Sequence, residues 1–83
     1  MKMNNRDVER TVVKALGKAL NLEEYKIDLD SHIVGDLGCW GEMDGINIIV
    51  EIQRAFKIEL AVKDIDNVIT VRDLVHKVES LIQ

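Results

Sequence analysis

The stretch that decides the fold is GDLGCWGEMDG at residues 35–45, followed by an apolar run that ends in FKIEL at residues 56–60. The glycines and aspartate before residue 42 indicate a turn, since these residues suit the backbone conformations of turns. The apolar residues after the turn predict a helix from about Met43 to Phe56. This should be the most buried helix, with a broad apolar face made of Met43, Ile46, Ile49, Val50, Ile52 and Phe56.

Two further amphipathic segments flank the central helix. The first is predicted to begin at a cap provided by Asn4 or Asn5 and to stop near Asn21. Its apolar residues recur at spacings of three and four and are Val8, Val12, Val13, Leu16 and Leu20. The last segment follows TVRD at residues 70–73, which resembles a capping box with Asp in the place of Glu or Gln. Its predicted face is Leu74, Val75, Val78, Leu81 and Ile82.

The rest of the chain is less regular. Residues 22–41 have no sustained period and predict a long loop that is pinned to the core at intervals, whereas residues 61–68 suffice for one or two helical turns. No stretch alternates with a period of two, which argues against strands. We therefore predict an all-α fold: a small four-helix bundle with a long first loop and a short third helix, forming a single domain over residues 1–83. Its core is expected between the second and fourth helices, with these residues buried: Ile49, Ile52, Phe56, Leu74 and Val78.

Composition and charge narrow the class of protein. The single cysteine, Cys39, and the lack of an apolar N-terminal segment predict a cytoplasmic protein, and the longest uncharged run, residues 46–50, is too short to span a membrane. Residues 1–20 hold five Lys or Arg and two Asp or Glu, a charge of +3, which leaves −7 for residues 21–83 because the whole chain carries −4. Such an acidic body disfavours nucleic acid and suits a protein partner with a basic surface.

The DLG turn at residues 36–38, a helix of fixed length ending in Phe56, and the apolar pair Ile58 and Leu60 together resemble the centre of an acyl carrier protein. IDLDSHIVGDLG at residues 27–38 and TVRDLV at residues 70–75 extend the resemblance over the whole chain. The resemblance implies an acyl-carrier-like bundle in which a Ser at the start of the second helix carries a phosphopantetheine arm. Counting back from Phe56 by the family's spacing reaches Glu42 instead, and the turn is one residue longer, with Trp40-Gly41 in the gap.

The missing serine predicts an acyl-carrier-like protein that has lost the carrier role, has no cofactor, and acts as a monomer through binding to a protein partner. Ser31 suits a turn and Ser80 lies in the last helix, so neither replaces the missing hydroxyl. No nucleophile–base arrangement is present, so we expect no enzymatic activity. One alternative is a genuine carrier of a specialised fatty-acid or polyketide pathway, which would hold phosphopantetheine. Another is an adaptor or immunity protein that shares only the fold.

The predicted partner-binding site is the turn and first coil of the second helix: Asp36, Cys39, Trp40, Glu42, Met43 and Asp44. By the resemblance, Asp44 matches an acidic position that carriers use for partner recognition, and acyl-chain or related biosynthetic enzymes are candidate partners. Glu42 could mimic the charge of the absent phosphate or simply favour the positive end of the helix dipole.

Other residues near this site admit two interpretations each. Cys39 is either a reactive thiol before a helix start or a small buried apolar group. Trp40 is either an exposed anchor for a partner or a ring packed over the helix start. No Cys/His spacing indicates zinc, and the calcium-loop fragments at residues 28–30 and 42–45 lack the remaining ligands, so no metal is expected.

Overall fold

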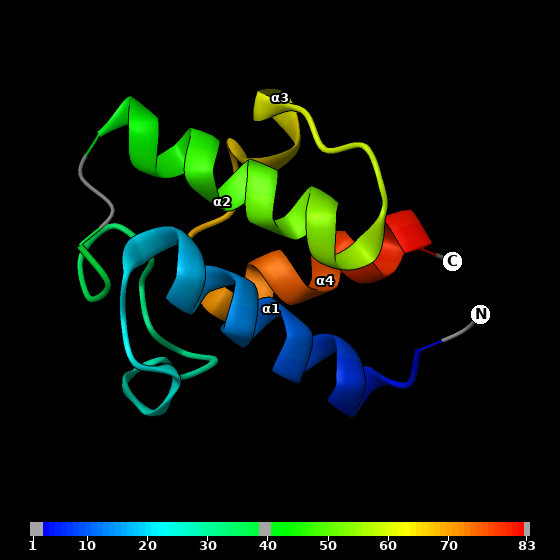
Figure 1. Ribbon diagram of the computed structural model, residues 1–83, viewed down its shortest axis with the longest axis horizontal. Coiled ribbons are helices and arrows are strands. Elements are labelled where there is room, and N and C mark those ends of the chain that lie inside the picture. Colours follow the sequence, from blue (N-terminus) through cyan, green and yellow to red (C-terminus); the bar gives the residue numbers. More distant parts are fainter. Residues whose placement is uncertain (1–2, 39–40, 83) are drawn as a thin grey trace.

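Helices dominate the computed structural model, which describes residues 3–38 and 41–82, apart from the side chain of Glu42 (Figure 1). In chain order they are α1 (Asn5–Leu20), the 3-10 helix η1 (Glu24–Lys26), α2 (Glu42–Phe56), α3 (Val62–Ile65) and α4 (Val71–Ile82). The described residues form no strand, only an isolated antiparallel bridge between His32 and Thr70. The predicted all-α class, the long first loop and the short third helix are thus confirmed.

Polar side chains and backbone geometry end α1 where the sequence predicted. The Asn4 side-chain oxygen accepts a hydrogen bond from the Asp7 N–H at 2.8 Å, which satisfies one of the free donors at the helix start. At the other end Asn21 adopts the left-handed conformation, with φ 57°, and its N–H donates to the Gly17 carbonyl. A Cβ at Gly17 would lie 2.9 Å from the Leu22 carbonyl oxygen, so glycine lets the chain turn back closely over the helix end.

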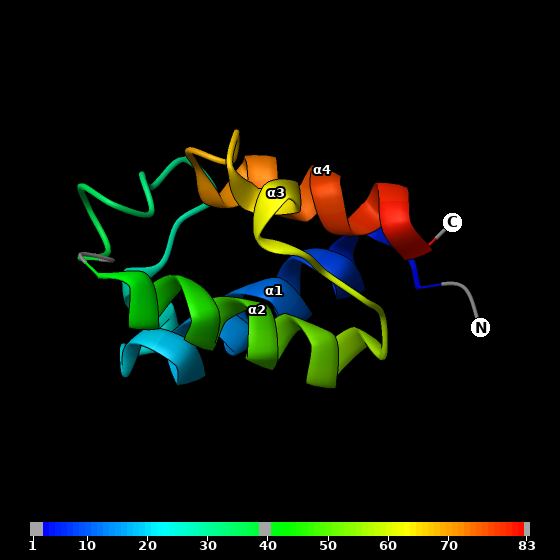
Figure 2. The same cartoon turned by 90° about the horizontal axis from the view of Figure 1, so that it is seen from above.

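The core is centred on α1, which packs against both α2 and α4 (Figures 1 and 2). The core was predicted to lie between the second and fourth helices. That prediction is wrong in leaving out α1, against which both of these helices pack. The second helix is also not the most buried one, because α1 contributes more buried positions. The buried residues of α1 are Val8, Val12, Ala15, Leu16 and Gly17. The buried residues of α4 are Val71, Leu74, Val75 and Val78, and Leu81, predicted on the apolar face, is 39% exposed near the end of the helix.

The buried side of α2 differs from the predicted one. Its buried residues are Ile48, Ile49 and Ile52, whereas Met43 and Ile46 are exposed. Phe56, predicted to be buried, is only half-buried at the edge of the core. At about 100° per residue, positions 48, 49, 52 and 56 share one side of the helix, and positions 43 and 46 lie away from its centre. The apolar residues of α2 thus cover two sides, of which only one meets α1.

The long first loop is held against the start of α4 by backbone hydrogen bonds. The Ile33 N–H donates to the Ile69 carbonyl at 2.9 Å, and the Val71 and Arg72 N–H groups donate to the carbonyls of Ser31 and Leu29 at 3.1 and 2.8 Å. An ion pair of 3.0 Å between Asp30 and Arg72 lies beside these bonds. The loop also buries side chains at intervals, as predicted: Ile27, Ile33 and Leu37.

The start of α4 is fixed by the predicted capping box. The Asp73 carboxylate accepts hydrogen bonds from the N–H groups of Thr70 at 3.0 Å and Ile69 at 3.1 Å. In return the Thr70 hydroxyl accepts one from the Asp73 N–H at 3.2 Å. The bond from the Thr70 N–H, followed by that from Ile69, favours the ionised carboxylate and holds the pKa of Asp73 below its usual value.

The orientation of α2 can be tested by making the same substitution, isoleucine to alanine, at two positions of this helix that differ in burial. Ile52 is fully buried and Ile46 is 45% exposed. Ile52→Ala should lower the free energy of unfolding by about 2–5 kcal/mol, because it leaves a cavity in the core. Ile46→Ala should cost less than about 1 kcal/mol. Urea unfolding of both variants measures the difference, and equal losses would contradict the orientation of α2.

The cap of α4 predicts a particular dependence of stability on pH. Because its pKa is lowered in the folded state, ionised Asp73 stabilises the fold above its unfolded-state pKa of about 4. That contribution is lost as the pH falls through the lower folded-state pKa. Asp73→Asn should therefore lower the free energy of unfolding near pH 7. The difference in free energy of unfolding between this variant and the wild type should shrink as the pH falls to about 3.

Urea midpoints across this range measure the effect, with Asp66→Asn as a control that removes the same charge at an exposed position before α4. A difference that stays constant with pH, or that is matched by the control, would contradict the capping role of Asp73.

Candidate functional site

The turn before α2 is closed by one aspartate. The Asp36 carboxylate accepts a hydrogen bond from the His32 N–H at 2.8 Å, and the Asp36 N–H donates to the His32 carbonyl at 2.8 Å. Leu37 is buried next to it, and Gly38 follows with φ 74°, a conformation that glycine adopts without strain. Asp36 therefore shapes the approach to α2, and its exposed side chain stays at the surface.

A second aspartate fixes the first turn of α2. Gly41 is the cap residue, and its N–H donates to the Asp44 carboxylate at 3.3 Å. Asp44 thus satisfies a free donor at the helix start, in the manner of the acidic residue of a capping box. The residue that the sequence assigned to partner recognition also has a structural role, although its half-buried side chain reaches the surface.

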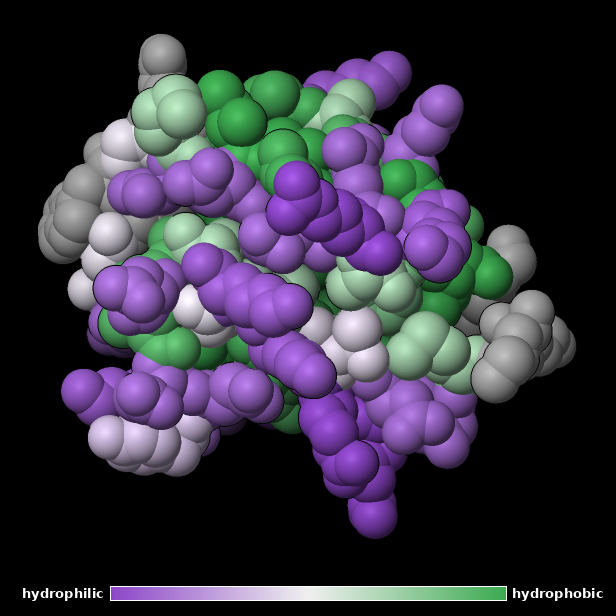
Figure 3. Space-filling model, in the orientation of Figure 1, coloured by the Kyte–Doolittle hydropathy of each residue, from purple (hydrophilic) through white to green (hydrophobic). Residues whose placement is uncertain are grey.

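Large apolar side chains are exposed around this helix start. Met43 is 65% exposed, Ile46 45% and Val34 of the preceding loop 58%. We call these three residues the α2-start patch. Val34 and Gly45 line the same small cavity, which connects the loop to the first turns of the helix. Figure 3 shows apolar surface along the edge of the molecule where α2 and α3 lie.

The cavity that Val34 and Gly45 line is small and apolar. Its volume is about 110 Å³, and its lining joins the loop to three helices: Ile33, Val34, Gly45, Ile48, Ile65, Val68 and Leu74. These side chains carry no acid, base or nucleophile. The cavity can accept apolar groups but supplies no catalytic chemistry of its own.

The predicted site residues are only partly brought together. Asp36 lies in the turn, and Met43 and Asp44 lie in the first turn of α2 at the same end of the molecule (Figure 1). Glu42 is the first residue of α2. Cys39 and Trp40 lie outside the described residues, so the two interpretations given for each stay open. Sequence reasoning missed Val34 and placed Ile46 in the core, because apolar type alone does not reveal which side of a helix faces water.

The hydroxyl groups considered as substitutes for the missing serine have local partners. Ser31 accepts a hydrogen bond from the Asp28 N–H at 3.1 Å, which confirms its predicted turn role. Ser80 donates to the Lys77 carbonyl at 2.7 Å within α4. Among the described residues, no group of three or more His, Cys, Asp or Glu side chains could hold a metal ion.

No protein-family model matches the chain. Within the described ranges, none of the helices combines the length and the apolar character needed to cross a membrane. The function is therefore inferred from the chemistry of the α2 start.

Proposed function

We propose that this protein is an acyl-carrier-like binding protein that is not an enzyme, carries no phosphopantetheine, and engages a protein partner through the start of α2. The observation that carries the proposal is the exposure of Met43 and Ile46 at the head of a helix whose buried side points elsewhere. Exposed apolar groups next to acidic ones are typical of surfaces that bind other proteins.

Apolar and acidic groups at this end of the molecule suggest the chemistry of the partner. The α2-start patch supplies apolar area, and Asp36 and Asp44 place carboxylates beside it. A partner surface with apolar side chains surrounded by Lys or Arg would match both features. Acyl-chain or related biosynthetic enzymes are the partner class that the carrier resemblance favours, and we propose that the protein binds as a monomer in the cytoplasm.

The proposed loss of the carrier role depends on position 42. Glu42 begins α2, where the resemblance to carriers calls for a serine hydroxyl. A carboxylate cannot accept a phosphopantetheinyl group in its place. Ser31 and Ser80 are engaged in a loop turn and in the last helix, and neither lies at the start of α2. A genuine carrier and an adaptor or immunity protein are the alternatives that the experiments below distinguish.

Site-specific crosslinking tests the partner surface. A photoreactive phenylalanine analogue placed at Met43 should give a discrete protein adduct in a lysate of the source cells. The same analogue at Tyr25, which is 77% exposed on η1, controls for general accessibility. Adding Ile46→Asp should abolish the Met43 adduct, because it puts a charge into the apolar contact. Equal adducts from Met43 and Tyr25, or an adduct insensitive to Ile46→Asp, would contradict the proposal.

Incubation with coenzyme A and a broad-specificity phosphopantetheinyl transferase tests the absence of the carrier role. The wild-type chain should gain no mass, whereas Glu42→Ser should be weakly modified because it restores a hydroxyl. The turn is one residue longer than in carriers, and this extra residue should displace the new hydroxyl from the position that the transferase requires. Because a displacement of about 1 Å can cost about a hundredfold in rate, deletion of Trp40 in that variant should increase modification.

A standard acyl carrier protein serves as the positive control for the transferase. Modification of the wild type at Ser31 or Ser80, located by peptide mass spectrometry, would contradict the proposed loss of the carrier role. An unmodified wild type whose crosslinked partners include no acyl-chain enzyme would favour the adaptor or immunity alternative.

A further inference from the structure

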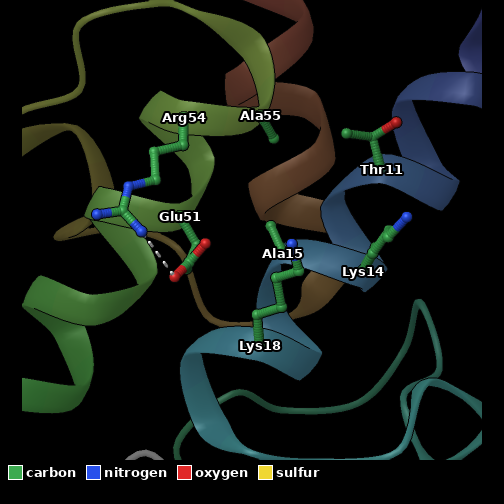
Figure 4. Close-up of a pocket in the computed structure, with 7 residues that line it drawn as sticks. All are labelled: Thr11, Lys14, Ala15, Lys18, Glu51, Arg54 and Ala55. Carbon is green, nitrogen blue, oxygen red and sulfur yellow. Dashed lines mark ion pairs between the residues drawn. The ribbon is translucent and has the colours of Figure 1, made fainter.

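A second surface, of opposite charge, lies between α1 and the last turns of α2. A hollow of about 390 Å³ lies along the surface where these two helices meet (Figure 4). We call it the α1–α2 groove, and its lining residues are Thr11, Lys14, Ala15, Lys18, Glu51, Arg54 and Ala55. It is lined by none of the residues of the α2-start patch.

Small residues and long cations give the groove its shape. Ala15 of α1 and Ala55 of α2 place only methyl groups in the space between the helices, which leaves room there. Lys18 of α1 runs into the space between the helices, whereas Lys14 points away from α2 and the Arg54 guanidinium turns toward Glu51 (Figure 4). The groove therefore combines two alanines on its inner side with three cations around it.

The positive charge of the groove is largely uncompensated. Its lining holds three cations and one acid, in a chain whose net charge is −4. The acid, Glu51, forms a 3.7 Å ion pair with Arg54, whose side chain is 74% exposed. Neither Lys14 nor Lys18 forms an ion pair with another residue that the structure describes. Like charges four residues apart on a helix repel each other, so an external anion would stabilise this pair of lysines.

We propose that the α1–α2 groove binds an acidic peptide segment of a protein partner. Carboxylates spaced along such a segment would meet Lys14 and Lys18 of α1 and Arg54 of α2, and a small apolar side chain between them would cover Ala15 and Ala55. Thr11 lines one end of the groove, with its methyl group toward Ala55 and its hydroxyl pointing away from α2 (Figure 4).

Charge also distinguishes this occupant from other anions. A nucleic acid or an anionic membrane presents negative charge well beyond a groove of this size. Residues 21–83 carry a net charge of −7, so the rest of the protein would repel such an extended anion. A short acidic segment places its charges only where the cations lie. The protein would then have two surfaces of opposite sign, one for a basic partner at the start of α2 and one for an acidic segment near its end.

Titration with a five-residue peptide of alternating glutamate and alanine, followed by backbone amide NMR at low salt, tests the site. The largest shifts should fall on Thr11, Lys14, Lys18 and Arg54. Lys14→Gln combined with Lys18→Gln should weaken binding by about tenfold. Lys26→Gln combined with Lys63→Gln removes the same charge at exposed positions outside the groove and should weaken it by less than about twofold.

Glu51→Gln provides a gain of binding that a loss of folding cannot imitate. Removing this carboxylate from the groove should tighten binding of the alternating peptide by about threefold. The proposal would be overturned by shifts centred elsewhere, by equal losses in the two double variants, or by no gain from Glu51→Gln. Tighter binding of an oligothymidylate of eight nucleotides, or of phosphatidylserine vesicles, would also overturn it, in favour of nucleic acid or a membrane.

Discussion

The hydrogen bonds between the Asp73 carboxylate and the N–H groups of Ile69 and Thr70 are the constraint on which the rest of the structure depends. They begin α4 and fix the strand-like segment before it, whose Ile69 carbonyl accepts the Ile33 N–H. Burial of Ile33 and Leu37 then holds the loop against the core, up to the turn before α2. A single ionised side chain thus connects the last helix with the segment that pairs with the long loop, and the N–H groups of Thr70 and Ile69 that it accepts lower its pKa.

The packing of α2 against α1 leaves other parts of α2 exposed to solvent. Helix α2 packs against α1 and buries Ile48, Ile49 and Ile52, whereas its first turns present Met43 and Ile46 to solvent. At its other end Ala55 lines a groove against α1 with three cations around it. Apolar groups with acids gather at one end of the helix and cations at the other. On the two proposals above, the domain binds two chemically different partners through separate surfaces.

Local signals in the sequence were enough for the helix ends and the loop. Asn4, Asn21 and the Thr70–Asp73 box act through neighbours a few residues away, so their roles could be predicted before any tertiary contact was known. The packing was harder, because β-branched and aliphatic residues cover more than one side of α2. Which side is buried depends on contacts between distant segments, and this is why Ile46 and Phe56 were placed wrongly in the core. Met43, which the sequence placed both on the apolar face and in the partner-binding site, is exposed. The groove was equally hidden, since Lys18 and Arg54 are far apart in the chain.

The central claim is that position 42 carries no prosthetic arm and that the start of α2 serves binding instead. Intact-mass spectrometry of the protein purified from its own cells tests this claim most directly, because every transferase and substrate is then at its natural level. We predict the mass of the unmodified chain. A species heavier by one phosphopantetheine group, with or without an acyl chain, would contradict the claim and identify the protein as a working carrier.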